Sequence, residues 1–339
     1  MELFGKRLKF AVVLNGIRNE FSPVRIVLVR EIDLIEGQTM ADFFEEFTER
    51  LLTTSQGKIR VRYGGSGFPI LLLHGHPRAH TTWFKVAPQL ARDFSVVCAD
   101  MPGFGRSYQP ETLAASSGKA KAAALHECMA RLGHDRFGVA GHDRGSYRAF
   151  RLAMDFPKSV AGLVVMDGIQ IYEVLSRADW RFAKNWWHWF FFAQSEKAEA
   201  AIQADPDLWY PAEAAQGPEN NLDYLAATRR PEVVRSMLAD YRAGLEFDYD
   251  DDRRDKEAGR RLQCPLGVLW SLHDDMESLY GDPVNPWADW SDQIVLRQGI
   301  LSGHHMAEEA PDDVAHHIKA FFAQRRLASA YGAFLPSTQ

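Results

Sequence analysis

The segment 141–145 reads Gly-His-Asp-Arg-Gly, with an aspartate midway between two glycines. This spacing is typical of a nucleophile elbow, in which glycines allow a sharp turn from a strand into a helix and the central side chain stands above the sheet. A serine at the centre would perform acyl transfer. An aspartate that displaces a leaving group from a saturated carbon instead forms an ester, whose carbonyl water can attack. Asp143 therefore predicts displacement at saturated carbon, at carbon–halogen bonds or epoxide rings.

Partners for this chemistry occur later in the chain. Water must be activated by a general base, and His304 is the best placed histidine because it follows the last strand signal; His305 is its adjacent rival. An acid should fix the tautomer of that histidine. Asp167 and Asp274 each follow a strand signal, and periodicity does not choose between them. The order nucleophile, acid, histidine is that of the α/β-hydrolase fold, which argues against a simple capping role for Asp143.

An oxyanion on the nucleophile needs two backbone donors. The N–H of His76, in the sequence His-Gly-His-Pro, and the N–H of Arg144 directly after the nucleophile are the best candidates. The side chain of His76 would then have no necessary role.

Hydrophobic runs alternate with helical patterns and predict the elements that position these residues. Such alternation is typical of an α/β fold with a mostly parallel central sheet, helices on both faces and reactive groups at the carboxyl ends of the strands. The expected strands are Lys58–Tyr63, Pro69–Leu73, Phe94–Ala99, Phe137–Ala140, Val160–Met166 and the segments Pro265–Trp270 and Gln293–Ile300.

Residues 168–244 are aromatic and helical in pattern and contain no buried-strand signal. We expect them to form a helical cap inserted into one hydrolase core, made of residues 40–167 and 245–339. Residues 1–39 are expected to be an N-terminal extension outside the native fold or the product of an upstream mis-start. The charged segment Asp248–Arg261 is expected to be a solvated return connection.

Composition narrows the class of protein. The 339 residues carry a net charge of −6, so a broad basic surface for nucleic acid is not expected. The aromatic run Trp186–Ala193 is much shorter than the roughly 20 apolar residues that cross a bilayer, and no export signal or membrane association is expected. Three widely spaced cysteines fit a reducing, cytoplasmic location. No metal or organic cofactor is expected, and a homodimer is compatible with the sequence.

The chain resembles the haloacetate dehalogenases, in particular the fluoroacetate dehalogenase branch of the α/β-hydrolases, from about Phe47 to Phe322. The resemblance is carried by the segments GHDRG, VVMDG, WHWFF, DYRAG and SGHHMAEEAP. It implies that Asp143 is the nucleophile, His304 the base and Asp167 the orienting acid. It also implies a halide pocket, and the donors for it are His188, Trp189 and Tyr241, whose N–H and O–H groups suit a departing anion. The other aromatic residues of 186–192 are expected to pack the cap onto the core.

The resemblance implies a small haloacid substrate, with water as the second reactant, and a carboxylate site at Arg144 and Tyr147. This site departs from the family pattern, because Tyr147 stands where the fluoroacetate enzymes have a second arginine. One arginine can still bind a carboxylate with two hydrogen bonds, but a larger or less acidic substrate is the alternative. An epoxide hydrolase with the same triad and a non-enzymatic ligand-binding protein of the same fold are the rival interpretations.

Overall fold

The computed structural model describes residue 44 and residues 46–331, and the prediction for residues 1–39 lies outside this part of the chain. Eight strands form one sheet in the order β1-β2-β4-β3-β5-β6-β7-β8. The pairs β1–β2 and β2–β4 are antiparallel, and the neighbours from β4 to β8 are parallel. The strands are β1 (Thr48–Thr53), β2 (Lys58–Gly65), β3 (Pro69–Leu73), β4 (Ser95–Ala99), β5 (Phe137–His142), β6 (Val160–Met166), β7 (Leu266–Ser271) and β8 (Ile294–Ile300).

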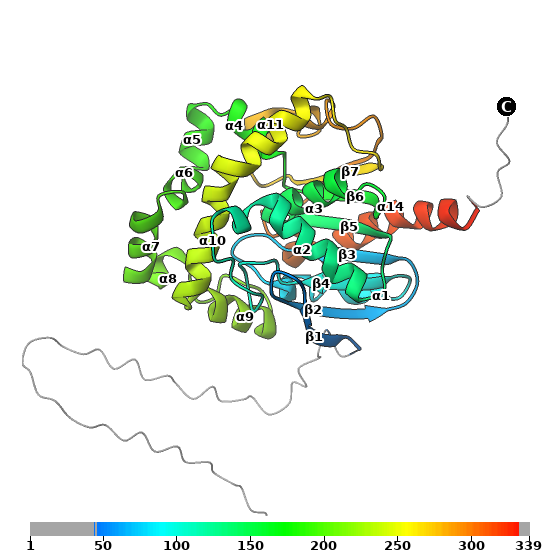
Figure 1. Cartoon of the computed structure of the whole chain (residues 1–339), viewed down its shortest axis with the longest axis horizontal. Helices are drawn as coiled ribbons and strands as arrows, with labels where there is room; N and C mark the ends of the chain where they lie inside the picture. Colours follow the sequence, from blue (N-terminus) through cyan, green and yellow to red (C-terminus); the bar gives the residue numbers. More distant parts are fainter. Residues whose placement is uncertain (1–43, 45, 332–339) are drawn as a thin grey trace, which may run out of the picture. The chain divides into compact units, whose positions relative to one another are not determined.

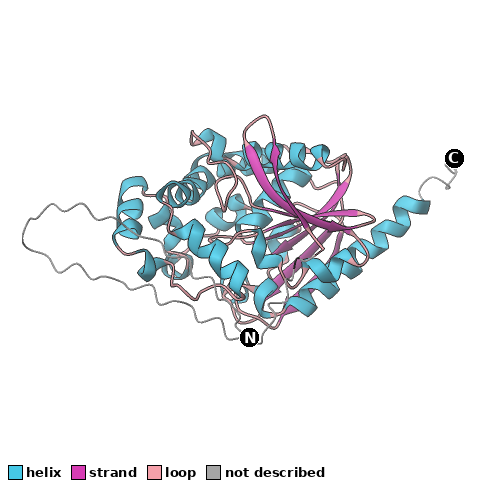
Figure 2. Ribbon diagram, turned by 90° about the horizontal axis from the view of Figure 1, so that it is seen from below, coloured by secondary structure: helices cyan, strands magenta, loops and turns pink. Residues whose placement is uncertain are grey.

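Apolar residues on both faces explain why the central strands are continuously hydrophobic. In β3, Leu71 and Leu73 enter one core cluster while Ile70 and Leu72 enter another on the opposite face. Helices α2 (Gly118–Arg131) and α3 (Arg144–Asp155) cover the first face, and α1 (Ala87–Ala91) and α14 (Pro311–Tyr331) cover the second. Figure 2 shows the strands lying between these helices. The predicted α/β fold, with a mostly parallel sheet covered on both faces, is confirmed.

A block of helices lies between β6 and β7 in the chain. Figure 1 shows these helices together at one side of the strands, in green and yellow. They are α4 (Ile171–Ser176), α5 (Trp180–Asn185), α6 (His188–Phe192), α7 (Ser195–Ala204), α8 (Pro206–Trp209), α9 (Pro218–Thr228) and α10 (Pro231–Ala243). A π-helical turn, Gly244–Asp248, joins α10 to α11 (Tyr249–Glu257).

The expectation for Asp248–Arg261 was wrong. Most of this segment forms α11, whose residues Asp251, Asp252 and Asp255 are buried. Arg151 on α3 donates to Asp255 over 2.7 Å, so the charges of the segment pair with buried cations of the core. The polar composition suggested a solvated loop, because a single sequence does not reveal which cations face its carboxylates.

Short helices complete the fold after β7 and β8. They are α12 (Met276–Tyr280) and α13 (Met306–Glu309), and 3₁₀ turns occur at His80–Trp83, Ala114–Ser116 and Asn285–Trp287. Across residues 44 and 46–331, no helix is both long enough and apolar enough to cross a membrane.

Candidate active site

Asp143 occupies the turn between β5 and α3. Its backbone has φ 49° and ψ −120°, a region that side chains with a Cβ rarely adopt. The backbone is crowded at two positions of this turn, and glycine at both positions allows it to form. A Cβ at Gly141 would lie 2.2 Å from the carbonyl oxygen of Gly145, and a Cβ at Gly145 would lie 2.4 Å from the carbonyl oxygen of Leu73. Strained backbone of this kind is common at functional sites. The sequence Gly-x-Asp-x-Gly thus folds into the elbow geometry that it predicts.

The two oxygens of Asp143 have different surroundings. The N–H of His76 donates to Oδ1 over 2.7 Å, and the backbone N–H of Arg144 is a further donor to the carboxylate. Burial raises the pKa of Asp143, but the charge of His304 and the hydrogen bond from the Arg144 backbone outweigh burial, and the net pKa is lowered. The carboxylate is therefore ionised, and both predicted backbone donors face it.

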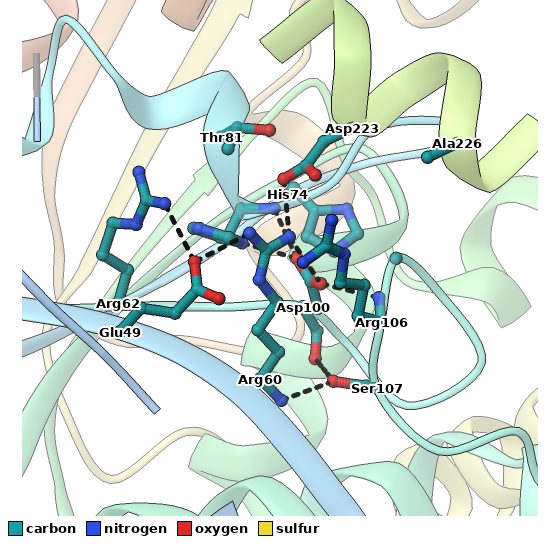
Figure 3. A network of polar contacts seen from close by, with 12 residues as sticks. Glu49, Arg60, Arg62, His74, Thr81, Asp100, Arg106, Ser107, Asp223 and Ala226 are labelled. Atoms are coloured by element: carbon teal, nitrogen blue, oxygen red, sulfur yellow. Dashed lines mark hydrogen bonds and ion pairs between the residues drawn. The ribbon is translucent and has the colours of Figure 1, made fainter. Parts of the chain in front are cut away.

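A buried network holds the loop that carries His76. Asp100, at the end of β4, accepts hydrogen bonds from the backbone N–H of His80 over 2.9 Å and from that of Arg106 over 2.8 Å. Its Oδ1 also lies 2.7 Å from Nδ1 of His80. The backbone N–H of Met101 donates to His74 Nε2 over 3.0 Å. Figure 3 shows Asp100 beside Arg60, Arg106 and Ser107. The network ties the loop after β3 to the end of β4 and so fixes the position of the His76 N–H.

His304 lies between the nucleophile and two further carboxylates. Its Nε2 is 4.0 Å from Oδ2 of Asp143, and its Nδ1 is 2.7 Å from Oδ2 of Asp274. Burial lowers the pKa of His304, but the hydrogen bond to Asp274 and the charges of Asp143 and Asp167 raise it, with a net value of about 9. The imidazole is therefore cationic at neutral pH while Asp143 is free.

The structure places the hydrogen bond of His304 on Asp274 and not on Asp167, which the family resemblance favoured. Oδ2 of Asp167 is 3.9 Å from His304 Nδ1. Asp167 instead accepts hydrogen bonds from the backbone N–H and the hydroxyl of Ser271. Both carboxylates converge on one imidazole because β6 and β7 are neighbours whose carboxyl ends meet at the same edge of the sheet.

A cavity of about 280 Å³ opens above Asp143. His188, Trp189 and Tyr241 all line it, so the predicted halide donors come together beside the nucleophile. Burial lowers the pKa of His188 to about 4 and raises that of Tyr241 well above its usual range. The imidazole is therefore neutral and the phenol protonated, and both are able to donate to an anion.

The side chain of His76 also lines this cavity, which the sequence did not indicate. Its Nε2 lies 3.2 Å from the hydroxyl of Tyr210. Burial lowers the pKa of His76 to about 3, so the ring is neutral. His305 is a cavity residue as well, and burial together with the charge of Arg78 lowers its pKa well below the usual range.

Arg144 is not among the residues that line the cavity. Nε donates to Oδ2 of Asp240 over 2.6 Å, and Nη2 donates to the carbonyl of Asp240 over 2.9 Å. The group is fully buried beside the rings of Tyr147, Trp189 and Tyr241, at 4.4–5.2 Å from their centroids. Tyr147 lines a separate small cavity beside Arg148. The predicted carboxylate site at Arg144 and Tyr147 is therefore not assembled in the cavity above Asp143.

Two further features of the site were missed. Asp240, one residue before Tyr241, binds Arg144, but the pair is separated by 96 positions and leaves no sequence signal. Trp186, which was expected to pack within the cap, lines the cavity and donates its indole N–H to Asp275 over 2.7 Å.

One group in the site has ligand atoms close enough to consider a metal ion. His142, Asp167 and His304 present atoms within 4.8 Å of one another. A metal requires a neutral imidazole, whereas the carboxylates around His304 keep it protonated near neutral pH. The arrangement therefore fits proton transfer better than metal binding.

Comparisons with known proteins agree with this geometry. The family profile of the α/β-hydrolase fold matches residues 69–204. A fluoroacetate dehalogenase from Burkholderia sp is 36% identical over 298 residues, which cover 84% of this chain and 96% of the relative. A soluble epoxide hydrolase from Corynebacterium sp. (strain C12) is 28% identical, with 79% of this chain and 95% of the relative covered. The solved structure of a "putative epoxide hydrolase" from Pseudomonas aeruginosa is 38% identical, with a TM-score of 0.78, and the match covers 84% of this chain and 98% of that one.

The fold and the elbow define an α/β-hydrolase. Within that superfamily, the chain belongs to the family of the haloacetate and fluoroacetate dehalogenases. It is accordingly an enzyme, a hydrolase.

Proposed function

We propose that this enzyme is a hydrolytic dehalogenase that works through an ester on Asp143. The observation that carries the proposal is the position of the Asp143 carboxylate, with Oδ1 held by the His76 N–H and Oδ2 facing His304 and the cavity. The 36% identity with a fluoroacetate dehalogenase supports a carbon–halogen bond as the target. Short 2-haloacids such as haloacetate remain the substrate class that the sequence predicts.

In the first step, Oδ2 of Asp143 attacks the carbon that bears the halogen. The carbon–oxygen bond forms as the carbon–halogen bond breaks, and the halide leaves with the bonding electrons. His188, Trp189 and Tyr241 are the donors that stabilise the departing anion. The low pKa of Asp143 favours this step, because the carboxylate is already ionised.

In the second step, water attacks the carbonyl carbon of the ester. Ester formation removes the negative charge of Asp143, which is one of the causes of the raised pKa of His304. The imidazole then loses its proton more readily and becomes a base for water. Negative charge that develops on Oδ1 is stabilised by the backbone N–H groups of His76 and Arg144. Collapse releases the alcohol and restores Asp143, so that the net products are alcohol, halide and a proton.

His304→Asn tests the mechanism directly. This variant should still form the ester but not hydrolyse it, because the base for water is absent. After treatment with a haloacetate, we expect a mass increase of roughly 58 Da on the peptide that contains Asp143. Intact-protein and peptide mass spectrometry measure it.

Two controls accompany this experiment. Asp143→Asn should lose turnover and should carry no adduct. His316→Asn, an exposed histidine on α14, should turn over like the parent enzyme and accumulate no ester. A folded His304→Asn protein that remains unmodified with every haloacid and haloamide tried would refute the ester mechanism.

An epoxide hydrolase is the second candidate function. The soluble epoxide hydrolase relative supports it, and so does Tyr241, whose raised pKa keeps its hydroxyl protonated beside the cavity. Tyr241 would donate to the ring oxygen as Asp143 opens the epoxide. Diol formation from epoxides without halide release from any organohalide would favour this function over dehalogenation.

A further inference from the structure

We propose that the substrate of this enzyme is an uncharged organohalide, such as a 2-haloamide, and not the carboxylate of a haloacid. The inference rests on the proposed dehalogenase function and specifies the substrate class of the same site. Three observations carry it: the commitment of Arg144 to Asp240, the location of Tyr147 outside the cavity, and the charges that line the cavity.

Arg144 is engaged by a carboxylate of the protein itself. Two of its three nitrogens donate to Asp240, and only Nη1 has no hydrogen-bond partner among the described residues. A substrate carboxylate needs two parallel N–H groups for bidentate binding, and the fork of Arg144 no longer offers them. The rings of Trp189 and Tyr241, which line the cavity, pack against the guanidinium, and Arg144 itself is not among the lining residues.

Asp240 also pairs with the other two cations near this position. It accepts a hydrogen bond from Arg148 over 2.9 Å and another from Lys121. Arg148 also donates to Asp248 over 2.7 Å. Arg144, Arg148 and Lys121 are thus buried with two carboxylates, and none of the three is among the residues that line the cavity.

The cavity itself carries an excess of negative charge. Asp143, Asp274 and Asp275 line it, whereas in the part of the chain that the structure describes its lining contains no lysine or arginine. His304 supplies one positive charge at neutral pH, and it is already opposite Asp143 and Asp274. An anionic substrate would therefore approach three carboxylates and one lining cation that two of them already share, at distances shorter than the Debye length of about 10 Å at 0.1 M salt. The buried charge of Arg144 also acts on Asp143 and His188, but it is paired with Asp240.

The neutral donors in the cavity fit an uncharged substrate. The imidazoles of His76 and His188 are both neutral, as their lowered pKa values of about 3 and about 4 indicate. With His188 assigned to the halide, the neutral ring of His76 remains to donate to an amide or ester carbonyl without the desolvation of a second anion.

A matched substrate pair tests the inference. 2-Chloroacetamide and 2-chloroacetate share the carbon–chlorine bond and differ mainly in charge. Chloride release gives kcat/KM for each at pH 8, and each value is divided by the rate of that compound with free acetate to remove intrinsic reactivity. We expect the corrected kcat/KM of the amide to exceed that of the acid at least tenfold. Added sodium sulfate should raise kcat/KM of the acid alone, because salt screens the repulsion.

Asp275→Asn provides the matched variant. It removes one negative charge from the cavity but keeps an oxygen that can accept a hydrogen bond from Trp186. We expect it to raise kcat/KM for 2-chloroacetate relative to kcat/KM for 2-chloroacetamide. Asp292→Asn is the control, because Asp292 is exposed and paired with Arg261 outside the cavity. This control should leave the ratio of the two substrates unchanged.

The outcomes separate the inference from the function on which it rests. If the corrected kcat/KM of the acid equals or exceeds that of the amide, the inference of an uncharged substrate is overturned, whereas the dehalogenase function is not. If neither compound releases chloride and neither leaves an adduct on His304→Asn, both the inference and the dehalogenase function fail. An amide adduct on Asp143, of about 57 Da, together with the expected ratio supports both.

Discussion

His304 has an acid available from each of two neighbouring strands. Asp274 makes the hydrogen bond to Nδ1 at 2.7 Å, and Asp167 is close enough, at 3.9 Å, to contribute its charge. An acid in this position holds the imidazole in the tautomer that leaves Nε2 free to take a proton, and it stabilises the imidazolium that results. From the geometry we infer that Asp274 orients His304 and that Asp167 acts mainly through its charge and through Ser271.

Removing each acid in turn distinguishes the two roles. Asp274→Asn should lower the pKa of His304, so that the ascending limb of the kcat–pH profile moves to lower pH. It should also lower the plateau of kcat, by up to about 10⁴-fold if no other acid replaces it. Asp167→Asn should cause a smaller loss and a smaller shift. Profiles of kcat against pH, with NMR titration of the imidazole, measure both effects.

In the unmodified enzyme, kcat for ester hydrolysis should rise with pH. His304 is cationic below its pKa of about 9 in the free enzyme, and the base form increases as pH rises. Because the ester lacks the charge of Asp143, the limb for ester hydrolysis should lie below pH 9. A larger effect of Asp167→Asn than of Asp274→Asn would restore the assignment implied by the family resemblance.

Several residues of the site were predictable from the sequence because parallel strands end at one edge of the sheet. A motif after each of several strands therefore predicts a cluster, and Asp143, His304, Asp167 and Asp274 form one. The choice between the two acids was not predictable, because it depends on loop geometry over about an ångström. The Arg144–Asp240 pair was not predictable either, because it joins an elbow to a helix far along the chain.

At the scale of elements, a buried ion pair joins three loops around the site. Arg78 follows the loop that carries His76, and its Nε donates to Glu308 on α13 over 2.8 Å. Glu308 also accepts from Thr82 over 2.8 Å and from the backbone N–H of Gln216 over 2.9 Å. The pair thereby connects the loop that carries His76, the helix α13 that follows His304 and the loop before α9.

Breaking this pair should destabilise the protein and disturb catalysis together. Arg78→Met and Glu308→Leu are each expected to cost about 3–5 kcal/mol of unfolding free energy, because each leaves the other charge buried without its counter-ion. The double variant should lose less than the sum of the two. Urea unfolding and kcat measure the effects. As a control, Asp292→Asn breaks an exposed pair and should cost less than about 1 kcal/mol of unfolding free energy. Additive losses in the double variant would contradict energetic coupling between Arg78 and Glu308.

Elements were predictable where burial imposes a pattern. The central strands are continuous apolar runs, and all of those expected are present. Strand β1 was not identified, because it lies at the edge of the sheet and most of its residues are exposed, so no buried face marks its sequence. Helix α11 was misjudged for the opposite reason, since its polar residues are buried against cations supplied by other elements.

At the scale of the whole molecule, buried carboxylates make stability depend on pH. Asp252 on α11 is buried, and burial raises its pKa to about 7 against the partial compensation of Arg151; Asp248 and Asp255 raise it further. The folded state therefore holds this proton at pH values where the unfolded chain, with a pKa near the ordinary 3.8, has released it. Stability from this residue is present at low pH and falls as pH rises from about 4 to about 7.

Asp252→Asn should remove this penalty. We expect the variant to be more stable than the parent at pH 8 and little changed at pH 4. The difference in unfolding free energy should grow by about 1.4 kcal/mol for each pH unit over which the folded and unfolded states of the parent differ by one proton. Thermal unfolding at both pH values measures the difference. An equal change in Tm at pH 4 and pH 8 would show that Asp252 does not titrate between them.

The carboxylates around the cavity also affect how the catalytic cycle closes. In the mechanism proposed above, the charge of Asp143 is absent while the ester exists, and the cavity residues His188, Trp189 and Tyr241 are the proposed donors to the displaced halide. Hydrolysis of the ester restores that charge beside Asp274 and Asp275, so the site becomes more negative at the moment when the halide must leave. We therefore expect the restored charge to favour release of the halide, and added halide to inhibit the enzyme only weakly.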